Sequence, residues 1–157
     1  WLGVRQPDFN ALCEITLHPE TLVCDQTAGL SLYVSPRYHL TLQLRRESSG
    51  LVIESILQAG ETRALLAQKT IIDDSPHRLI IESKTRDEHG SILGAYILRH
   101  AMEETGAASE APEIARSDIR LFGGTVTGTG FTGAFFACFA EGPANAVSFS
   151  RFRANGY

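Results

Sequence analysis

The sequence predicts an all-β sandwich, and two observations carry this prediction. Short runs rich in Leu, Ile, Val, Tyr, Phe and Thr recur about every eight to twelve residues. Gly, Pro, Asp and Ser, which supply the backbone angles that turns require, separate these runs. This spacing is typical of sandwiches and barrels built from short antiparallel strands.

The expected strands can be placed in order along the chain. They lie near residues 11–17, 29–34, 38–46, 51–58, 62–71, 77–85, 93–100, 118–122, 133–141 and 147–153. Turn-forming groups such as Ser35-Pro36, Asp73-Asp74-Ser75-Pro76 and Gly142-Pro143 lie between them. Residues 102–117, rich in Ala and Glu, break this rhythm, and we expect a surface excursion there.

Alternation of apolar and polar residues is clearest in the third expected strand. One set of alternate positions holds Tyr38, Leu40, Leu42 and Leu44, and the other holds His39, Thr41, Gln43 and Arg45. Because successive strand residues point to opposite faces, one face is expected in the core and the other in contact with solvent. The preceding strand adds Tyr33 to the polar face.

Composition limits the class of protein. With 157 residues and 43% hydrophobic content, the chain fits a single domain spanning residues 1–157. The formal net charge is −4 and the basic residues are scattered, which argues against a nucleic-acid partner. No apolar run has the roughly 18 to 20 residues that a membrane helix needs, so no membrane partner is expected.

The N-terminus and the cysteines limit the possible classes of protein less than the composition does. The chain begins with Trp1 and shows no signal-peptide pattern, so it looks like a processed piece. Cys13, Cys24 and Cys138 make an odd number, which leaves at least one thiol unpaired. A Cys13–Cys24 disulfide is one alternative, and burial of each cysteine as a small hydrophobic side chain is the favoured one.

No catalytic or metal constellation emerges from the residues. Most acidic residues fall in turns or in the excursion, and nothing brings the strand residues Glu14, Glu54 and Glu82 together as a glycosidase carboxylate pair. A Gly-x-Ser-x-Gly nucleophile motif is absent. Cys13, His18 and Cys24 match no zinc spacing, so we expect no metal site and no cofactor.

The most distinctive stretch is glycine-rich, from Leu121 to Gly133. A phosphate-binding loop is not indicated, because the Gly-Lys-Ser/Thr ending is absent and a strand is expected to follow. Two interpretations remain: a flexible turn between strands, or a loop that displays Phe131 to a partner.

The polar sheet face suits a sugar chain. Flat aromatic rings cover the apolar C–H face of a pyranose, while amide and guanidinium groups bind its hydroxyls. Tyr33, His39, Gln43 and Arg45 combine these groups and are the candidate carbohydrate-binding residues. The alternative is an ordinary solvent-facing sheet surface.

Several stretches together carry a family resemblance. They are Trp-Leu-Gly-Val-Arg-Gln at 1–6, Ala-Gly-Leu-Ser-Leu-Tyr at 28–33, Gly-Phe-Thr-Gly-Ala-Phe-Phe-Ala-Cys-Phe-Ala at 130–140 and Ser-Phe-Ser-Arg-Phe-Arg at 148–153. In this order they resemble the C-terminal concanavalin-A-like domain of glycoside hydrolase family 43 β-xylosidases and arabinofuranosidases. That domain is also classed as a xylan-binding carbohydrate-binding module of the family 91 type.

The resemblance implies a jelly-roll sandwich of two antiparallel sheets that follows a catalytic five-bladed propeller. The catalytic carboxylates would then belong to the propeller, and Phe131 would be the loop aromatic that reaches its pocket. Xylan or arabinoxylan and the N-terminal propeller are the implied partners, and an extracellular location is implied as well. The chain departs from the family at Ser148-Phe149-Ser150, where many members read Asp-Phe-Asp, so calcium is implied by the family but not supported here.

Two functional hypotheses from different classes follow. The first is a non-catalytic accessory module that binds xylan or arabinoxylan, or that completes the active-site pocket of an attached hydrolase. The second is a purely structural sandwich that contacts protein and has no affinity for sugar. An autonomous hydrolase would need a carboxylate pair that the sequence does not supply.

We predict that the isolated chain does not hydrolyse xylo-oligosaccharides or aryl glycosides, because acid–base catalysis requires two correctly placed carboxyl groups. The measurement is product release by a preparation free of full-length enzyme. Reproducible turnover by such a preparation would contradict the prediction.

Overall fold

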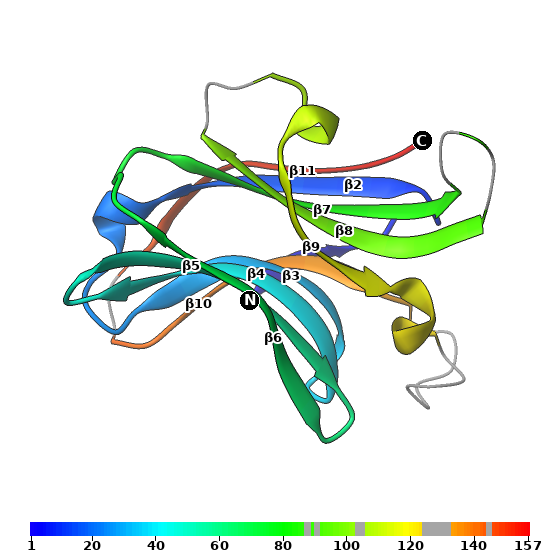
Figure 1. Cartoon of the computed structure of the whole chain (residues 1–157), viewed down its shortest axis with the longest axis horizontal. Helices are drawn as coiled ribbons and strands as arrows, with labels where there is room; N and C mark the ends of the chain where they lie inside the picture. The colour runs from blue at the N-terminus through cyan, green and yellow to red at the C-terminus, as the bar shows by residue number, and fades with distance from the viewer. Residues whose placement is uncertain (87–88, 90–91, 103–105, 124–132, 144–145) are drawn as a thin grey trace.

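The computed structural model describes the chain except for residues 87–88, 90–91, 103–105, 124–132 and 144–145. The described residues form two antiparallel sheets that stack as two layers (Figure 1). An all-β sandwich, the predicted fold class, is therefore confirmed. No helix in these residues is long and apolar enough to cross a membrane.

The six-stranded sheet has the order β1-β10-β3-β4-β5-β6. Its strands are β1 (Leu2–Arg5), β10 (Phe135–Glu141), β3 (Thr27–Ser35), β4 (Tyr38–Glu47), β5 (Gly50–Ala59) and β6 (Thr62–Ile71).

The five-stranded sheet has the order β11-β2-β7-β8-β9. Its strands are β11 (Ser148–Gly156), β2 (Ala11–His18), β7 (His77–Arg86), β8 (Ile92–Met102) and β9 (Glu113–Asp118). Three short 3-10 helices complete the described elements: η1 (Pro19–Thr21), η2 (Ala108–Glu110) and η3 (Ile119–Phe122).

The core lies between the sheets and consists of the alternate apolar positions of their strands. Fully buried side chains are Leu30, Leu32, Leu40, Leu42 and Leu44 from one sheet and Ile15, Leu17, Leu79 and Ile81 from the other. In the six-stranded sheet the register pairs Leu30 with Leu42 and Leu32 with Leu40. The core face predicted for β4 is therefore confirmed. Thr41 and Gln43 on its other face are buried as well, so the solvent contact expected there is wrong for these two residues.

Strand β1 was missed by the sequence analysis. It has only four residues, all exposed, so it shows no alternation of buried and exposed positions. It pairs with β10, and Gly3 lies opposite Ala137. A Cβ at Gly3 would come within 2.6 Å of the Phe136 carbonyl oxygen, so this close approach depends on glycine.

Two expectations near the excursion need correction. Residues 102–117 are not only a surface segment, because β9 begins at Glu113 and pairs with β8, with Ala115 opposite Leu98. The strand expected at 118–122 is instead the 3-10 helix η3. The Asp118 side chain accepts a hydrogen bond from the Arg120 N–H at 2.8 Å, which caps this helix and ends the strand.

The cysteines are not bridged. Cys13 and Cys138 are buried, Cys24 is exposed, and all three thiols are free. Burial, followed by the nearby Cys138 and Glu14, raises the pKa of the Cys13 thiol far above its usual range. A buried thiol of this kind behaves as a small hydrophobic side chain.

Gly29 and Ser31, two neighbours on one face of β3, allow a stability test. A Cβ at Gly29 would lie 2.3 Å from the Leu42 carbonyl oxygen, so we expect Gly29→Ala to lower the free energy of unfolding by about 1 to 3 kcal/mol. Chemical denaturation of the two proteins measures this change.

Ser31→Ala is the control for this test. The Ser31 hydroxyl is fully buried and makes no hydrogen bond to any residue that the structure describes, so its removal should raise the unfolding free energy by up to about 1 kcal/mol. Equal destabilisation by both substitutions would contradict the close strand approach at Gly29.

Candidate functional site

The outer face of the six-stranded sheet, the face turned away from the core, carries the predicted site residues. Tyr33 lies opposite His39 in the register of β3 and β4, and Gln43 and Arg45 follow on the same face of β4. Leu40 and Leu42 point into the core. The predicted register is therefore confirmed.

A cleft of about 610 Å³ opens at one end of this outer face. We call it the aromatic cleft, and it is lined by Trp1, Gly3, Tyr33, Pro36, His39, Phe135, Ala137 and Glu141. Gly3 and Ala137, which are small and lie opposite each other, leave space between the larger rings.

Aromatic contacts fix the rings around this cleft. The Trp1 ring stacks on Phe139 with centroids 5.0 Å apart, and it meets Tyr33 at 4.9 Å in a tilted arrangement. Tyr33 and His39 lie nearly parallel, 6.3 Å apart. Flat rings with partly open faces can pack against the C–H face of a sugar.

Gln43 and Arg45 have a different environment from Tyr33 and His39. Both bind the Glu54 carboxylate of β5: the Arg45 guanidinium reaches Oε1 at 2.8 Å and the Gln43 amide reaches Oε2 at 3.1 Å. Gln68 is a third residue that donates to this carboxylate, and Arg45 also contacts Glu47. Burial would raise the pKa of Glu54, but the hydrogen bonds from Arg45 and Gln43 hold it below its usual value.

The predicted set therefore divides in two. Tyr33 and His39 line the aromatic cleft, whereas Gln43 is buried and, with Arg45, satisfies Glu54. The expectation that all four side chains share one exposed surface is wrong for Gln43. A polar strand residue can be bound to its neighbours instead of facing solvent, and alternation alone does not distinguish the two.

Sequence reasoning missed Trp1, Phe135 and Glu141 as cleft residues. A signal for Phe135 was present, because Phe135, Ala137 and Phe139 alternate with the core residues Phe136 and Cys138. Trp1 gave no comparable signal, since it precedes a strand that shows no alternation.

The buried carboxylates of the five-stranded sheet are paired with arginine. Arg78 donates to Glu14 at 2.5 and 2.9 Å, and Arg99 donates to Glu82 at 3.2 Å. Tyr157 also donates to Glu82 at 2.7 Å. Both carboxylates are therefore bound by side chains of neighbouring elements and do not face an open cleft as a pair.

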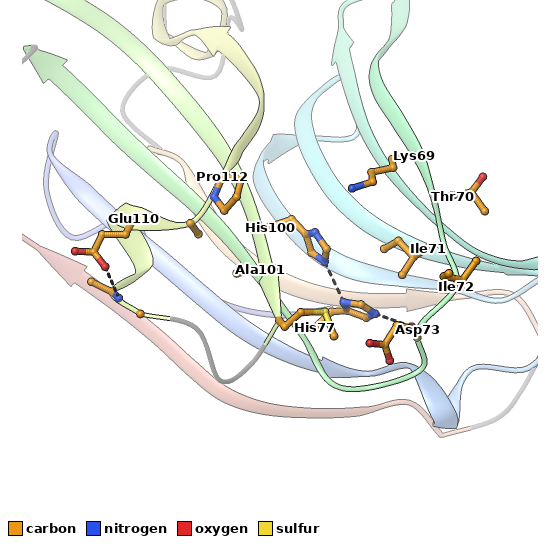
Figure 2. A pocket seen from close by; sticks show the side chains of 14 residues that line it. Lys69, Thr70, Ile71, Ile72, Asp73, His77, His100, Ala101, Glu110 and Pro112 are labelled. Atoms are coloured by element: carbon orange, nitrogen blue, oxygen red, sulfur yellow. Dashed lines mark hydrogen bonds between the residues drawn. The ribbon is translucent and has the colours of Figure 1, made fainter.

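A second cavity of about 610 Å³ lies at the opposite edge of the six-stranded sheet, between β6, the start of β7 and the segment after β8. We call it the histidine cavity (Figure 2). Its lining includes Lys69, Asp73, His77, His100 and Glu110 together with apolar side chains.

Hydrogen bonds fix the proton positions of the histidine pair. His77 Nε2 lies 3.0 Å from the Asp73 carbonyl oxygen, which can only accept, so Nε2 carries the proton of the neutral ring. His77 Nδ1 then accepts from His100 Nε2 at 3.0 Å. In this arrangement His100 Nδ1 keeps its lone pair.

Both imidazoles resist protonation. Burial lowers the pKa of His77 below its usual value. Burial, followed by the charges of His77 and Lys69, lowers the pKa of His100 to about 4.

Comparison with known protein families shows to which family the chain belongs. The family model of the β-xylosidase C-terminal concanavalin A-like domain matches residues 1–155. The chain belongs to this GH43 family. No curated protein sequence shows significant similarity to it.

Solved structures of GH43 proteins share the fold of this GH43 C-terminal domain. A mutant of the GH43 protein BlXynB from Bacillus licheniformis superposes with a TM-score of 0.79 at 18% identity, over 99% of this chain and 29% of that protein. A xylan β-1,4-xylosidase from Bacillus halodurans gives 0.78 at 18% identity, over 97% of this chain and 28% of that enzyme. This chain therefore spans less than a third of the length of either protein.

The fold also occurs in another setting. A functionally unknown protein from Saccharomyces cerevisiae superposes with a TM-score of 0.71 at 11% identity, over all of this chain and 74% of that one. At this identity the likeness shows the fold alone.

The residues of this GH43 domain do not fit calcium at 148–150. Ser148 N–H donates to the Thr21 hydroxyl, and the Ser150 hydroxyl is 2.9 Å from His18 Nε2. Calcium prefers carboxylate and carbonyl oxygens, which these side chains do not supply. Within the described residues, no group of three or more His, Cys, Asp or Glu side chains could hold a metal.

Phe131 lies outside the described residues, so its predicted role stays a prediction. The residues that flank this segment, Phe122, Gly123, Gly133 and Ala134, line a third cavity of about 500 Å³. Phe9 also lines it and is 76% exposed.

We predict that acid destabilises this domain through the histidine pair. An unfolded histidine binds a proton below about pH 6.5, whereas folded His100 does so only near pH 4. The free energy of unfolding should therefore fall as the pH drops from about 6.5 to about 4, by on the order of 2 kcal/mol.

Urea denaturation of the wild type and His100→Gln between pH 7.5 and 4 measures this effect. The Gln variant keeps a donor for His77 but cannot take up the proton, so its pH slope should be smaller. His39→Gln, from the aromatic cleft, is the matched control. Identical slopes for the wild type and His100→Gln would show that the pair does not titrate as argued.

Proposed function

We propose that the chain is a non-catalytic carbohydrate-binding module of a hemicellulose-degrading glycoside hydrolase, and that the aromatic cleft binds xylan or arabinoxylan. The observation that carries this proposal is the cleft itself, in which Trp1, Tyr33 and His39 hold their rings around a hollow of about 610 Å³. Membership in the GH43 family and likeness to a xylan β-1,4-xylosidase support it.

The chemistry of the cleft matches a sugar chain in two respects. Aromatic faces contribute apolar contact with pyranose C–H groups. The His39 ring and the Glu141 carboxylate offer hydrogen-bond partners for hydroxyl groups at its rim. An extracellular location in a polysaccharide-degrading enzyme follows as part of the same proposal.

A second candidate function is contact with the N-terminal catalytic propeller domain of the parent protein. The observation that favours it is a group of exposed apolar side chains on and near β1: Leu2 at 72%, Val4 at 42% and Phe9 at 76%. Strand β1 is also the edge of its sheet. A surface of this kind fits a protein partner.

Through such a contact, the domain would complete the active-site pocket of an attached β-xylosidase or α-L-arabinofuranosidase. A purely structural sandwich would make the same contact without affinity for sugar. The two functions are compatible, because the aromatic cleft and the exposed residues Leu2 and Val4 lie on different sides of β1.

Sugar binding can be tested by calorimetric titration of the isolated domain with xylan, arabinoxylan and cellulose fragments. We expect binding to the first two. Tyr33→Ala should weaken it about tenfold, because an aromatic contact contributes roughly 0.5 to 1.5 kcal/mol beyond the area that it buries.

Phe9→Ala is the matched control, since it removes an exposed aromatic ring outside the aromatic cleft. It should leave sugar affinity unchanged. Equal loss in both variants, or no binding of any glycan by the folded wild type, would reject the cleft as a sugar site and favour the structural alternative.

A further inference from the structure

We propose that the histidine cavity binds a small molecule that carries a carboxylate on a compact, partly apolar body. The proposal does not rest on sugar binding at the aromatic cleft, because the two cavities lie at opposite edges of the six-stranded sheet. Its evidence is the shape of the cavity, its apolar rim and a lysine, Lys69, that forms no ion pair with any described residue.

The cavity has the size and lining of a small-molecule site. Its volume of about 610 Å³ lies within the roughly 300 to 1,000 Å³ typical of ligand pockets. Ile71, Ile72, Met102 and Pro112 supply apolar contact. Ile72 is fully exposed, so a large apolar side chain stands at the mouth without any cover.

Lys69 supplies a cation without a counter-ion. It makes no hydrogen bond or ion pair with any described residue, and Figure 2 shows its amine directed toward His100. The carboxylates nearby bind other groups and form no ion pair with Lys69 in the described part of the chain. Asp73 accepts from Ser75 N–H at 2.8 Å, Asp74 pairs with Arg46 at 2.8 Å, and Glu110 accepts from Ala107 N–H.

His100 supplies the second contact. Its Nε2–H donates to His77, and its Nδ1 is the one imidazole nitrogen of the pair that no described group binds. When His100 takes up a proton from solvent, Nδ1–H becomes a donor for a carboxylate oxygen. Lys69 and His100 can then bind the two oxygens of one carboxylate.

This arrangement links binding to pH. In the empty cavity, burial and the charges of His77 and Lys69 oppose protonation of His100. A bound carboxylate adds a negative charge beside the ring and favours its protonated form. Binding should therefore consume a proton and strengthen as the pH falls toward about 5.

The carboxylate of the ligand could belong to a free organic acid or to a uronic acid group of a polysaccharide. Both present a carboxylate on a small body with C–H surface. Titration with sodium isobutyrate, sodium D-glucuronate and neutral D-glucose distinguishes them. Tighter glucuronate binding indicates the acidic sugar, and tighter isobutyrate binding indicates a free organic acid.

The experiment is isothermal titration calorimetry of the folded domain with these three probes at pH 5.5 and 7.5. We expect a carboxylate probe to bind, glucose not to bind in this cavity, and affinity to be higher at pH 5.5. Lys69→Gln should weaken binding at least about fivefold, because a hydrogen bond to a charged group is lost. Lys69 is exposed, so the variant should remain folded, and circular dichroism checks this.

Arg37→Gln is the matched control, because it removes the same charge from an exposed turn on the β3–β4 side of the molecule. It should leave carboxylate affinity unchanged. Ile72→Ser should weaken isobutyrate binding while keeping the fold, since this side chain is fully exposed. Absence of binding by either carboxylate, or equal loss in Lys69→Gln and Arg37→Gln, would overturn the proposal.

Discussion

The burial of one row of leucines on β3 and β4 is the constraint on which the rest of the structure depends. Leu30 and Leu32 lie opposite Leu42 and Leu40, and all four are fully buried against the second sheet. Because strand side chains alternate with a period of two, a slip of one residue would move this row to the outer face. The same burial therefore places Tyr33 and His39 on the outer face.

Both outer faces are stabilised by ion pairs. Glu54 binds Arg45, Glu14 binds Arg78 and Glu82 binds Arg99, each pair joining neighbouring strands. A buried carboxylate without a partner would be strongly unfavourable, so each pair restricts the register of its strands as the leucines do from the other side. These glutamates therefore have structural roles in the fold that the sequence alone could not separate from catalytic ones.

The sequence predicted the fold where alternation was strong and failed where other forces decided the structure. Strands β3 to β7 follow from apolar alternation and turn residues, and the register of β4 was predictable from its leucines. Strands β1 and β9 were not predicted, because both are short. Strand β1 also depends on pairing with β10, which is distant in the sequence. The break at Asp118 depends on a side-chain cap, which a search for apolar runs overlooks.

The candidate site was predictable to the same extent. The alternation of strand residues alone predicted that Tyr33 and His39 lie on the same face of the sheet, where they are opposite each other. Alternation could not predict that the Gln43 side chain donates to Glu54, because this hydrogen bond depends on a residue of the next strand. Alternation also could not place Trp1 in the cleft, because β10 lies between β1 and β3 in the sheet and β1 itself was not predicted.

The positions of the two cavities follow from the sheet order. The aromatic cleft lies beside β1 and β10 at one edge of the six-stranded sheet, and the histidine cavity lies beside β6 at the other. The lining of the cleft extends from β1 to Tyr33 of β3 and His39 of β4, so β5 separates it from β6, and neither cavity shares a lining residue with the other. Contact of a partner domain with the exposed β1 would therefore leave the β6 edge accessible. A ligand there would meet Lys69 and the imidazole pair beside the carboxylates of Asp73 and Glu110. The sandwich can in this way present chemically distinct surfaces at its two edges, because a single sheet register determines both.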